Sequence, residues 1–142
     1  MVLRRDMTRG LLLLASLLAL TGCPGSGDRL RPDETTSVRH TANNEVCFAV
    51  HDAGDYQPVF ISINPRNIPP PKQKYTLMPP LNVKDAQLCI PPSFYTFAGD
   101  GQFIVKYILK SRTQSQPTRS VVVGVEVSNG EIHEFPLANN EI

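Results

Sequence analysis

The sequence has no tryptophan, three cysteines, three histidines and a formal net charge of only +1. A near-neutral chain lacks the basic footprint expected of a nucleic-acid-binding protein. It also lacks a long apolar run: residues 10–20 form an apolar stretch of 11, whereas a membrane-spanning helix needs about 20. The length of 142 residues fits one domain with a tail better than two full domains.

What is present at the N-terminus resembles a secretory signal peptide. Arg4, Arg5 and Arg9 precede the short apolar stretch. The sequence Leu-Thr-Gly-Cys at residues 20–23 then resembles the bacterial lipobox, whose Cys is acylated and becomes the new N-terminus. An ordinary signal peptide followed by a chance Cys is the alternative. We expect residues 1–22 to be removed and Cys23 to hold the protein on an envelope membrane, facing the periplasm, through acyl chains. The choice between inner and outer membrane stays open.

The rest of the chain divides into a tether and a domain. Residues 23–35 are polar, with Gly and Pro, and are expected to form a flexible tether. Residues 36–142 are expected to form the folded domain. Removal of the signal takes away three basic residues and one acidic residue, which leaves 11 basic and 12 acidic residues. All 13 prolines lie in residues 23–142, and so many prolines argue against a helical domain.

The remaining two cysteines, Cys47 and Cys89, would lie in an oxidising compartment, where a disulfide is expected. A redox-active or metal-binding pair is the alternative. Metal sites need more ligands at tighter spacing, and neither Cys has such neighbours in the sequence.

Short alternating segments separated by turn residues predict β-strands throughout the domain. In residues 102–110 every second side chain is apolar and predicts a core-facing strand, as in residues 120–128. Asn129-Gly130 is the strongest hairpin signal in the chain. The segments expected as strands are 38–42, 46–50, 59–63, 75–78, 87–90, 102–110, 120–128 and 131–137. Seven or eight short strands predict an all-β, antiparallel, immunoglobulin-like β-sandwich, with a small barrel as the alternative.

Catalytic patterns are weak. His40 and His133 fall in predicted strands and are expected to be solvated. His51-Asp52 is more suggestive, but adjacent strand residues point to opposite faces. Motifs for acyl chemistry, for paired-His metal binding and for phosphate binding are missing from the sequence. We therefore expect a protein without catalytic residues, metal or other cofactor, which acts by binding.

Two surfaces are candidates for binding a protein partner. The Pro-rich segment 65–80 is a predicted long loop with an edge strand, and its candidate contact residues are Arg66, Lys72, Lys74, Tyr75 and Met78. The alternative is a stiff cover that keeps a sheet edge from aggregating. The second candidate is acidic and comprises Glu126, Glu131, Glu134 and Glu141, which would steer a basic partner or simply form a solvated edge.

The order of several elements resembles a group of small enterobacterial periplasmic lipoproteins described as type VI secretion immunity proteins. The elements that carry the resemblance are the lipobox ending in Gly22-Cys23, the Asn-Glu-Val-Cys of residues 44–47, the strand at 59–64, Cys-Ile-Pro at 89–91, Tyr-Thr-Phe at 95–97 and the alternating strand at 101–107. The resemblance covers most of residues 11–110. The Pro-Pro-Pro run at 69–71 departs from it, so specificity carried by that loop need not be shared.

The resemblance implies a periplasmic lipoprotein that binds and neutralises a toxin delivered by neighbouring cells. The alternative is an envelope accessory lipoprotein that holds an assembly or envelope partner through a sheet edge or the Pro-rich loop. A third reading, a lipid-anchored hydrolase, would require a polar cleft that groups His51 with acidic residues.

Overall fold

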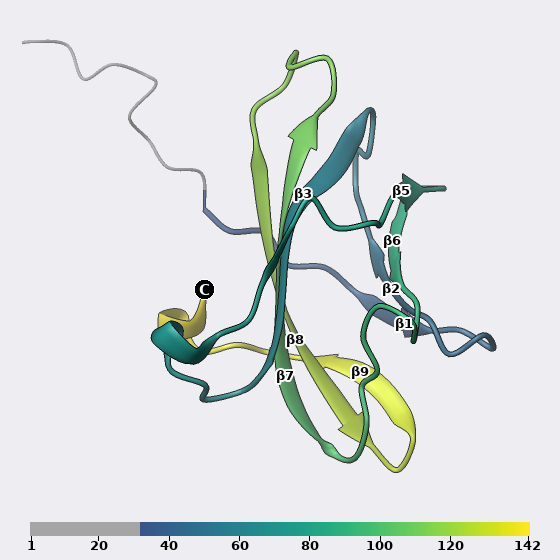
Figure 1. Cartoon of the computed structure of the whole chain (residues 1–142), viewed down its shortest axis with the longest axis vertical. Helices are drawn as coiled ribbons and strands as arrows, with labels where there is room; N and C mark the ends of the chain where they lie inside the picture. The colour runs from purple at the N-terminus through teal and green to yellow at the C-terminus, as the bar shows by residue number, and fades with distance from the viewer. Residues whose placement is uncertain (1–31) are drawn as a thin grey trace, which may run out of the picture. The chain divides into compact units, whose positions relative to one another are not determined.

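The computed structural model describes residues 32–142, which form two antiparallel β-sheets (Figure 1). The predicted signal peptide, the predicted lipidation site Cys23 and most of the predicted tether lie outside these residues. The strands of the described part are β1 (Val38–His40), β2 (Val46–Ala49), β3 (Tyr56–Pro65), β4 (Thr76–Leu77), β5 (Val83–Lys84), β6 (Gln87–Ile90), β7 (Gly101–Ser111), β8 (Arg119–Ser128) and β9 (Glu131–Phe135). Among residues 32–142, no helix has the length and apolar character needed to cross a membrane.

The strand order confirms the predicted all-β sandwich. The smaller sheet has the order β1-β2-β6-β5, and the larger has the order β4-β3-β7-β8-β9. This matches the ABED and CFG sheets of an immunoglobulin-type sandwich, with β4 and β9 added at the two edges of the second sheet. Figure 1 shows the long strands β3, β7 and β8 side by side, with the smaller sheet to one side of them.

The core lies between the two sheets and follows the predicted alternation. In β7 the side chains of Phe103, Val105, Tyr107 and Leu109 are buried, and in β8 those of Val121, Val123, Val125 and Val127 are buried. The smaller sheet contributes Val46, Phe48, Leu88 and Ile90. The rings of Phe48 and Tyr107 meet across the sheets with centroids 5.8 Å apart. Burial of these apolar side chains is the main stabilisation of the domain.

Turn chemistry explains which hairpins the sequence predicted. Asn129 and Gly130 have φ of 52° and 78°, the left-handed pair needed for a tight hairpin, and they join β8 to β9 as expected. The predicted hairpin of β1 and β2 is also present. The two-residue strand β5 was not predicted. It pairs with β6 across Asp85 and Ala86, which adopt the same left-handed backbone without the Asn-Gly or Asp-Gly signature.

Prolines lie where the sheet tolerates them. Pro58 lies inside β3, where the pairing with β7 shifts register between Pro58 and Phe60. It lies outside the part of β3 that pairs with β4, which is Phe60 and Ile61. Pro65 ends β3. The Pro-rich segment that follows contains the 3-10 helix η1 (Pro70–Lys72) and the edge strand β4, within the predicted edge strand 75–78.

The predicted disulfide joins Cys47 to Cys89. These residues are direct partners in the β2–β6 ladder. Because Val46 and Phe48 face the core, alternation puts the disulfide on the outer side of the smaller sheet. It therefore ties two neighbouring strands of one sheet, whereas the antibody disulfide joins the two sheets.

Candidate partner-binding surface

Five exposed residues along the end of the Pro-rich segment form what we call the β4 patch: Lys72, Lys74, Tyr75, Leu77 and Met78. Tyr75, Leu77 and Met78 retain 63%, 66% and 73% of their accessible surface, and they are three of the four exposed large apolar residues in the described part of the chain. Exposed aromatic and Met side chains with polar residues around them are typical of a protein-binding surface. Four of these residues were predicted contact residues; Leu77 was not.

The β4 patch rests on a rigid support from β3. The buried Asn64 side chain donates from Nδ2 to the carbonyl oxygen of Lys74 at 3.0 Å, and its Oδ1 accepts from the Lys74 N–H at 2.8 Å. The same Nδ2 also donates to Ser62 Oγ at 2.8 Å. The Tyr75 ring stacks on Phe60 with centroids 5.5 Å apart. Asn64 therefore replaces a strand partner for Lys74 and fixes the start of β4.

The other end of the patch has an unusual backbone. Met78 has φ of 47°, in the left-handed region that residues other than Gly, Asn and Asp rarely occupy. Its N–H donates to the carbonyl oxygen of Val59 at 2.9 Å, which holds it against β3. An exposed Met side chain is thus displayed from a constrained backbone, a combination that is common at functional sites.

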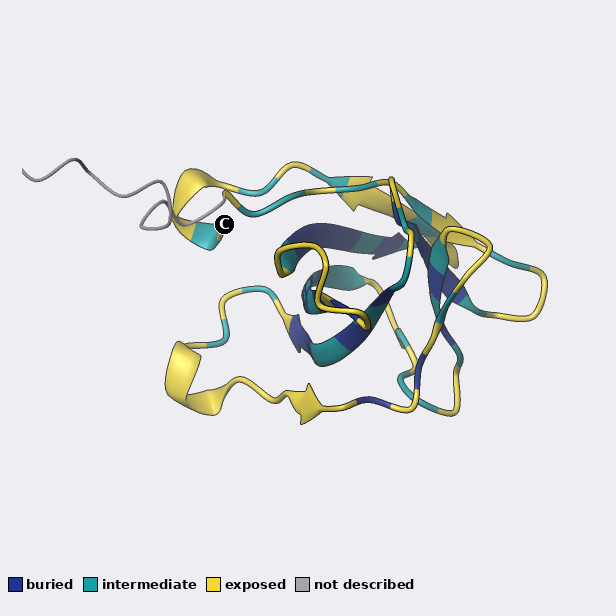
Figure 2. Cartoon of the chain, turned by 90° about the horizontal axis from the view of Figure 1, so that it is seen from above, coloured by how far each residue is buried: buried dark blue, intermediate teal, exposed yellow. Residues whose placement is uncertain are grey.

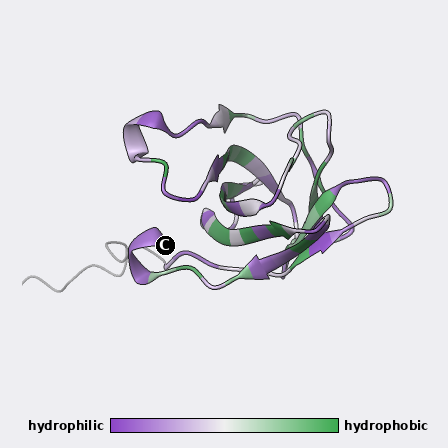
Figure 3. Ribbon diagram, turned by 90° about the horizontal axis from the view of Figure 1, so that it is seen from below, coloured by the Kyte–Doolittle hydropathy of each residue, from purple (hydrophilic) through white to green (hydrophobic). Residues whose placement is uncertain are grey.

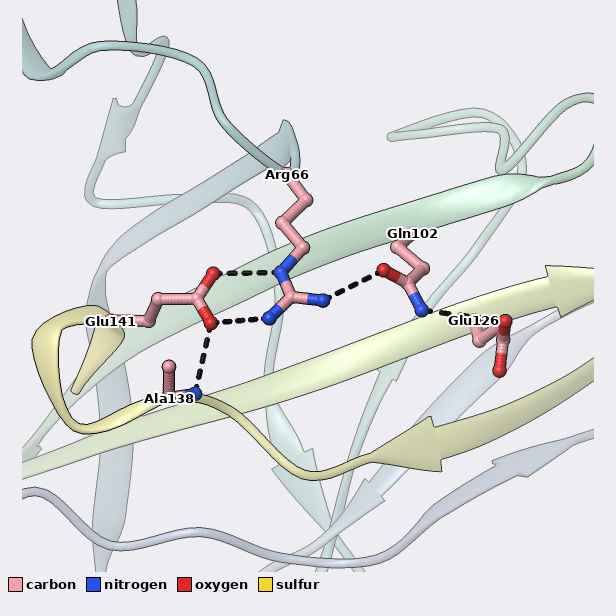
Figure 4. A network of polar contacts seen from close by, with 5 residues as sticks. All are labelled: Arg66, Gln102, Glu126, Ala138 and Glu141. Carbon is pink, nitrogen blue, oxygen red and sulfur yellow. Dashed lines mark hydrogen bonds and ion pairs between the residues drawn. The ribbon is translucent and has the colours of Figure 1, made fainter.

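Arg66, the fifth predicted contact residue, is bound by partners within the domain (Figure 4). Its Nε and Nη2 donate to the two carboxylate oxygens of Glu141 at 2.9 and 2.7 Å, and its Nη1 donates to Gln102 Oε1 at 2.9 Å. The guanidinium also lies 5.0 Å from the Phe135 ring centroid. The Arg66 hydrogen bonds, together with the Ala138 N–H, lower the pKa of Glu141 to about 2. Arg66 thus holds the C-terminal segment.

The Arg66–Glu141 ion pair helps to form a groove of about 530 Å³ on the outer face of the larger sheet. Its floor comes from Ser62, Asn64, Ile104, Lys106 and Val122. The Pro-rich segment forms one wall, and the C-terminal segment with the 3-10 helix η2 (Asn139–Glu141) forms the other. Figure 2 shows these two segments projecting as arms on the same side, and Figure 3 shows that η2 is hydrophilic. The groove adjoins the β4 patch through Phe60 and Gln73.

The end of the predicted tether lies on this sheet. The Glu34 N–H donates to the carbonyl oxygen of Ser120, and the Val122 N–H donates to that of Glu34, both at 2.8 Å. The Glu34 carboxylate accepts from Arg119 Nη2 at 2.6 Å and from Nε at 2.8 Å. These hydrogen bonds raise the pKa of Arg119. Asp33 lies 3.7 Å from the ammonium of Lys106. The chain is therefore held to the domain from residue 33 or 34 onward, although the sequence suggested a tether up to residue 35.

The histidines lie in different places. His51 is exposed in the turn after β2, and His40 is exposed in β1. His133 Nε2 lies 3.1 Å from Glu126 Oε2 on the adjacent strand.

In the acidic candidate surface, Glu134 accepts from the Val38 N–H at 3.1 Å and Glu141 binds Arg66. Three of its four carboxylates thus have partners within the domain.

One cluster in the described part has metal-ligand atoms within 4.8 Å of one another: Glu45, Cys47 and Cys89. Both sulfurs belong to the disulfide. A metal binds a thiolate, so this cluster does not offer the ligands that a metal needs.

Residues 33–130 match a protein family described as a domain of unknown function, DUF7480. The chain belongs to DUF7480. Comparison with curated proteins and with solved structures gave no match. The DUF7480 match covers β1 to β8 and the whole β4 patch, and it ends in the turn before β9. The C-terminal wall of the groove, with Glu141, therefore lies beyond the part of the chain that defines the family.

Proposed function

We propose that this DUF7480 protein is a lipid-anchored periplasmic immunity protein, which binds and neutralises a toxin delivered by type VI secretion. The observation that carries the proposal is the β4 patch, in which Tyr75, Leu77 and Met78 are exposed within four consecutive residues of a backbone held against β3. We infer the compartment from the lipobox that ends in Cys23. We infer the target from the resemblance of residues 11–110 to immunity lipoproteins.

The physical basis of neutralisation would be complementarity alone. An inhibitor that covers a toxin needs a surface that is already ordered, because ordering side chains on binding costs affinity. The Asn64 hydrogen bonds to Lys74 and the Tyr75–Phe60 stack supply that order. Aromatic and Met side chains give a large contact area at the centre of an interface.

Co-expression tests the proposal. Cells that produce the toxin encoded beside this gene in the periplasm should survive when they also produce the full chain, and should die with an empty vector. Failure to protect, together with no measurable binding to that toxin, would overturn the proposal.

The anchor is tested in the same cells. A Cys23→Ala variant should leave the membrane fraction, whereas wild type should remain in it through its acyl chains. Equal amounts of both proteins in the membrane fraction would contradict lipid anchoring at Cys23.

A second candidate function is supported by the open edge of β4. An envelope accessory protein could hold an assembly subunit there by adding a strand to the sheet. Gene neighbourhood separates the two candidates, since a secretion cluster favours immunity and an assembly operon favours the accessory role. Pull-down from an envelope extract would identify the partner in either case.

A further inference from the structure

We infer that the open edge of β4 receives an extended, acidic segment of the partner, which adds to the larger sheet as a further strand. This inference rests on the proposed function and goes further by naming the surface and the chemistry of the segment that it binds.

The backbone polar groups of β4 point alternately toward β3 and toward the open side. Thr76 pairs with Ile61, and the Met78 N–H donates to Val59. The polar backbone groups of an edge strand alternate between the neighbouring strand and the open side. The N–H and C=O of Tyr75 and Leu77 are therefore turned away from β3. Strand addition would use these groups.

An apolar surface lies beside the open edge of β4. Leu77 is the register partner of Phe60, and the Tyr75 ring stacks on Phe60, so both side chains lie on the outer face of the sheet. Tyr75 is 63% exposed and Leu77 is 66% exposed. A strand laid along β4 would place every second side chain on this face, against Tyr75 and Leu77. The segment should therefore carry apolar residues at alternate positions.

The charged residues around β4 favour an acidic segment. From Tyr56 to Lys84 the sequence has no Asp or Glu, while Lys72 and Lys74 belong to the β4 patch and Lys84 lies in β5 of the smaller sheet. Arg66, the other cation of this stretch, is neutralised by Glu141. An incoming acidic segment would meet Lys72 and Lys74 and no acidic residue of this stretch, which favours encounter and correct pairing.

The same lysines explain how an exposed edge is kept from self-association. Lysines on edge strands discourage pairing between copies of a protein. Two β4 edges would bring lysines against lysines, whereas an acidic strand would relieve the repulsion. The patch would thus exclude a second copy of this chain and admit the partner.

The test uses the full chain purified from membranes in detergent, with synthetic peptides as probes. A peptide of five Glu-Val repeats should bind and should protect the amide hydrogens of Tyr75 and Leu77 from exchange. A peptide of five Lys-Val repeats should bind at least about tenfold more weakly, because it meets like charges. A peptide of five Glu-Pro repeats should not bind, because proline cannot donate to the ladder. Equal binding of all three peptides, or binding without protection at Tyr75 and Leu77, would overturn the inference.

Variants locate the binding to β4. The Lys72→Glu/Lys74→Glu double variant should lose about tenfold or more of its affinity for the Glu-Val peptide. Leu77→Pro should abolish the protection of the Tyr75 amide, because the N–H that the substitution removes from residue 77 faces the open side. Ile142→Ser is the matched control, since Ile142 is the fourth exposed large apolar residue and lies across the groove from β4. A loss in Ile142→Ser equal to that in the lysine variant would contradict the assignment.

A lipid surface is the competing occupant of a basic, apolar patch. Wild type in vesicles of three parts phosphatidylethanolamine to one part phosphatidylglycerol should show the same exchange at residues 75–78 as in detergent. Protection in vesicles without peptide would overturn the inference in favour of the membrane.

Toxin protection separates this inference from the proposed function. If wild type protects cells and the lysine variant protects equally well, the inference fails and the proposed function stands. If wild type neither protects cells nor binds the toxin, the proposed function fails, whatever the peptides do.

Discussion

Arg66 and Glu141, 75 residues apart in the sequence, are joined by two hydrogen bonds of 2.9 and 2.7 Å. This bidentate contact links the start of the Pro-rich segment to the last turn of the chain. It sets the distance between the two walls of the groove on the outer face of the larger sheet.

Replacement of Glu141 by Gln should loosen the C-terminal wall of the groove. Gln offers one acceptor oxygen and no charge to Arg66, so the bidentate ion pair is lost. Deuterium uptake should rise in residues 136–142 and remain unchanged in β7. Glu131→Gln is the control, because it makes the same chemical change at an exposed side chain of β9. Equal uptake in both variants would show that the Arg66 contact does not hold this segment.

Asp55 should make the stability of the domain depend on pH in the acid range. Its carboxylate accepts from the Thr113 N–H at 2.9 Å, the Thr113 hydroxyl at 2.7 Å and the Ser111 hydroxyl at 2.8 Å, and these bonds lower its pKa to about 2. A lowered pKa in the folded state stabilises the protein above the unfolded pKa of 3.8, and this contribution is lost as the pH falls toward 2. Glu141 adds to the same trend between its ordinary 4.5 and about 2.

Urea unfolding at pH 7, 4, 3 and 2 measures this dependence. Asp55→Asn should be less stable than wild type at pH 7, and the difference should shrink toward pH 2. A difference that does not change with pH would contradict the assignment of the carboxylate as the titrating group.

Gly124→Ala should destabilise the hairpin of β8 and β9. A Cβ at Gly124 would lie 2.6 Å from the backbone oxygen of Phe135 and 2.9 Å from its ring. Overpacking of this kind costs about 1–3 kcal/mol in the free energy of unfolding. Gly101→Ala is the matched control, because a Cβ there would meet its nearest neighbour, Phe103, at 3.8 Å. Thermal unfolding should show a lower Tm for Gly124→Ala alone; a similar Tm for both variants would count against the close contact.

The long alternating strands were predictable because their pattern is local. β7 and β8 show their core faces in the sequence, and β6 has the predicted bounds 87–90. Interactions across long sequence separations were not predictable. Arg66 looked like a contact residue, but its partner is 75 residues away. Glu34 looked like part of a tether, but its partners are Ser120, Val122 and Arg119 in β8.

The candidate surface was also predicted in part. Tyr75 and Met78 stood out by residue type in a Pro-rich segment, and alternation along the short strand 75–78 could have added Leu77. The support beneath them had no local signal, because Asn64 acts through its side chain on the backbone of a residue ten positions later.

Loss of the disulfide should destabilise the domain substantially. Cys47 and Cys89 close a loop with a sequence separation of 42, for which chain entropy gives about 4 kcal/mol. The Cys47→Ala/Cys89→Ala double variant should unfold at a much lower urea concentration than wild type. Thiol titration of the unfolded, unreduced Cys23→Ala variant should find no free thiol; two free thiols would refute the pairing.

We propose that the β4 patch binds the toxin encoded beside this gene. The most direct measurement is calorimetric titration of the full chain, purified in detergent, with that toxin in an inactive form. We expect one-to-one binding with a Kd below about 1 μM, weakened about tenfold or more by Lys72→Glu/Lys74→Glu and unchanged by Ile142→Ser. Absence of heat with wild-type protein, or equal affinity in wild type and the lysine variant, would contradict it.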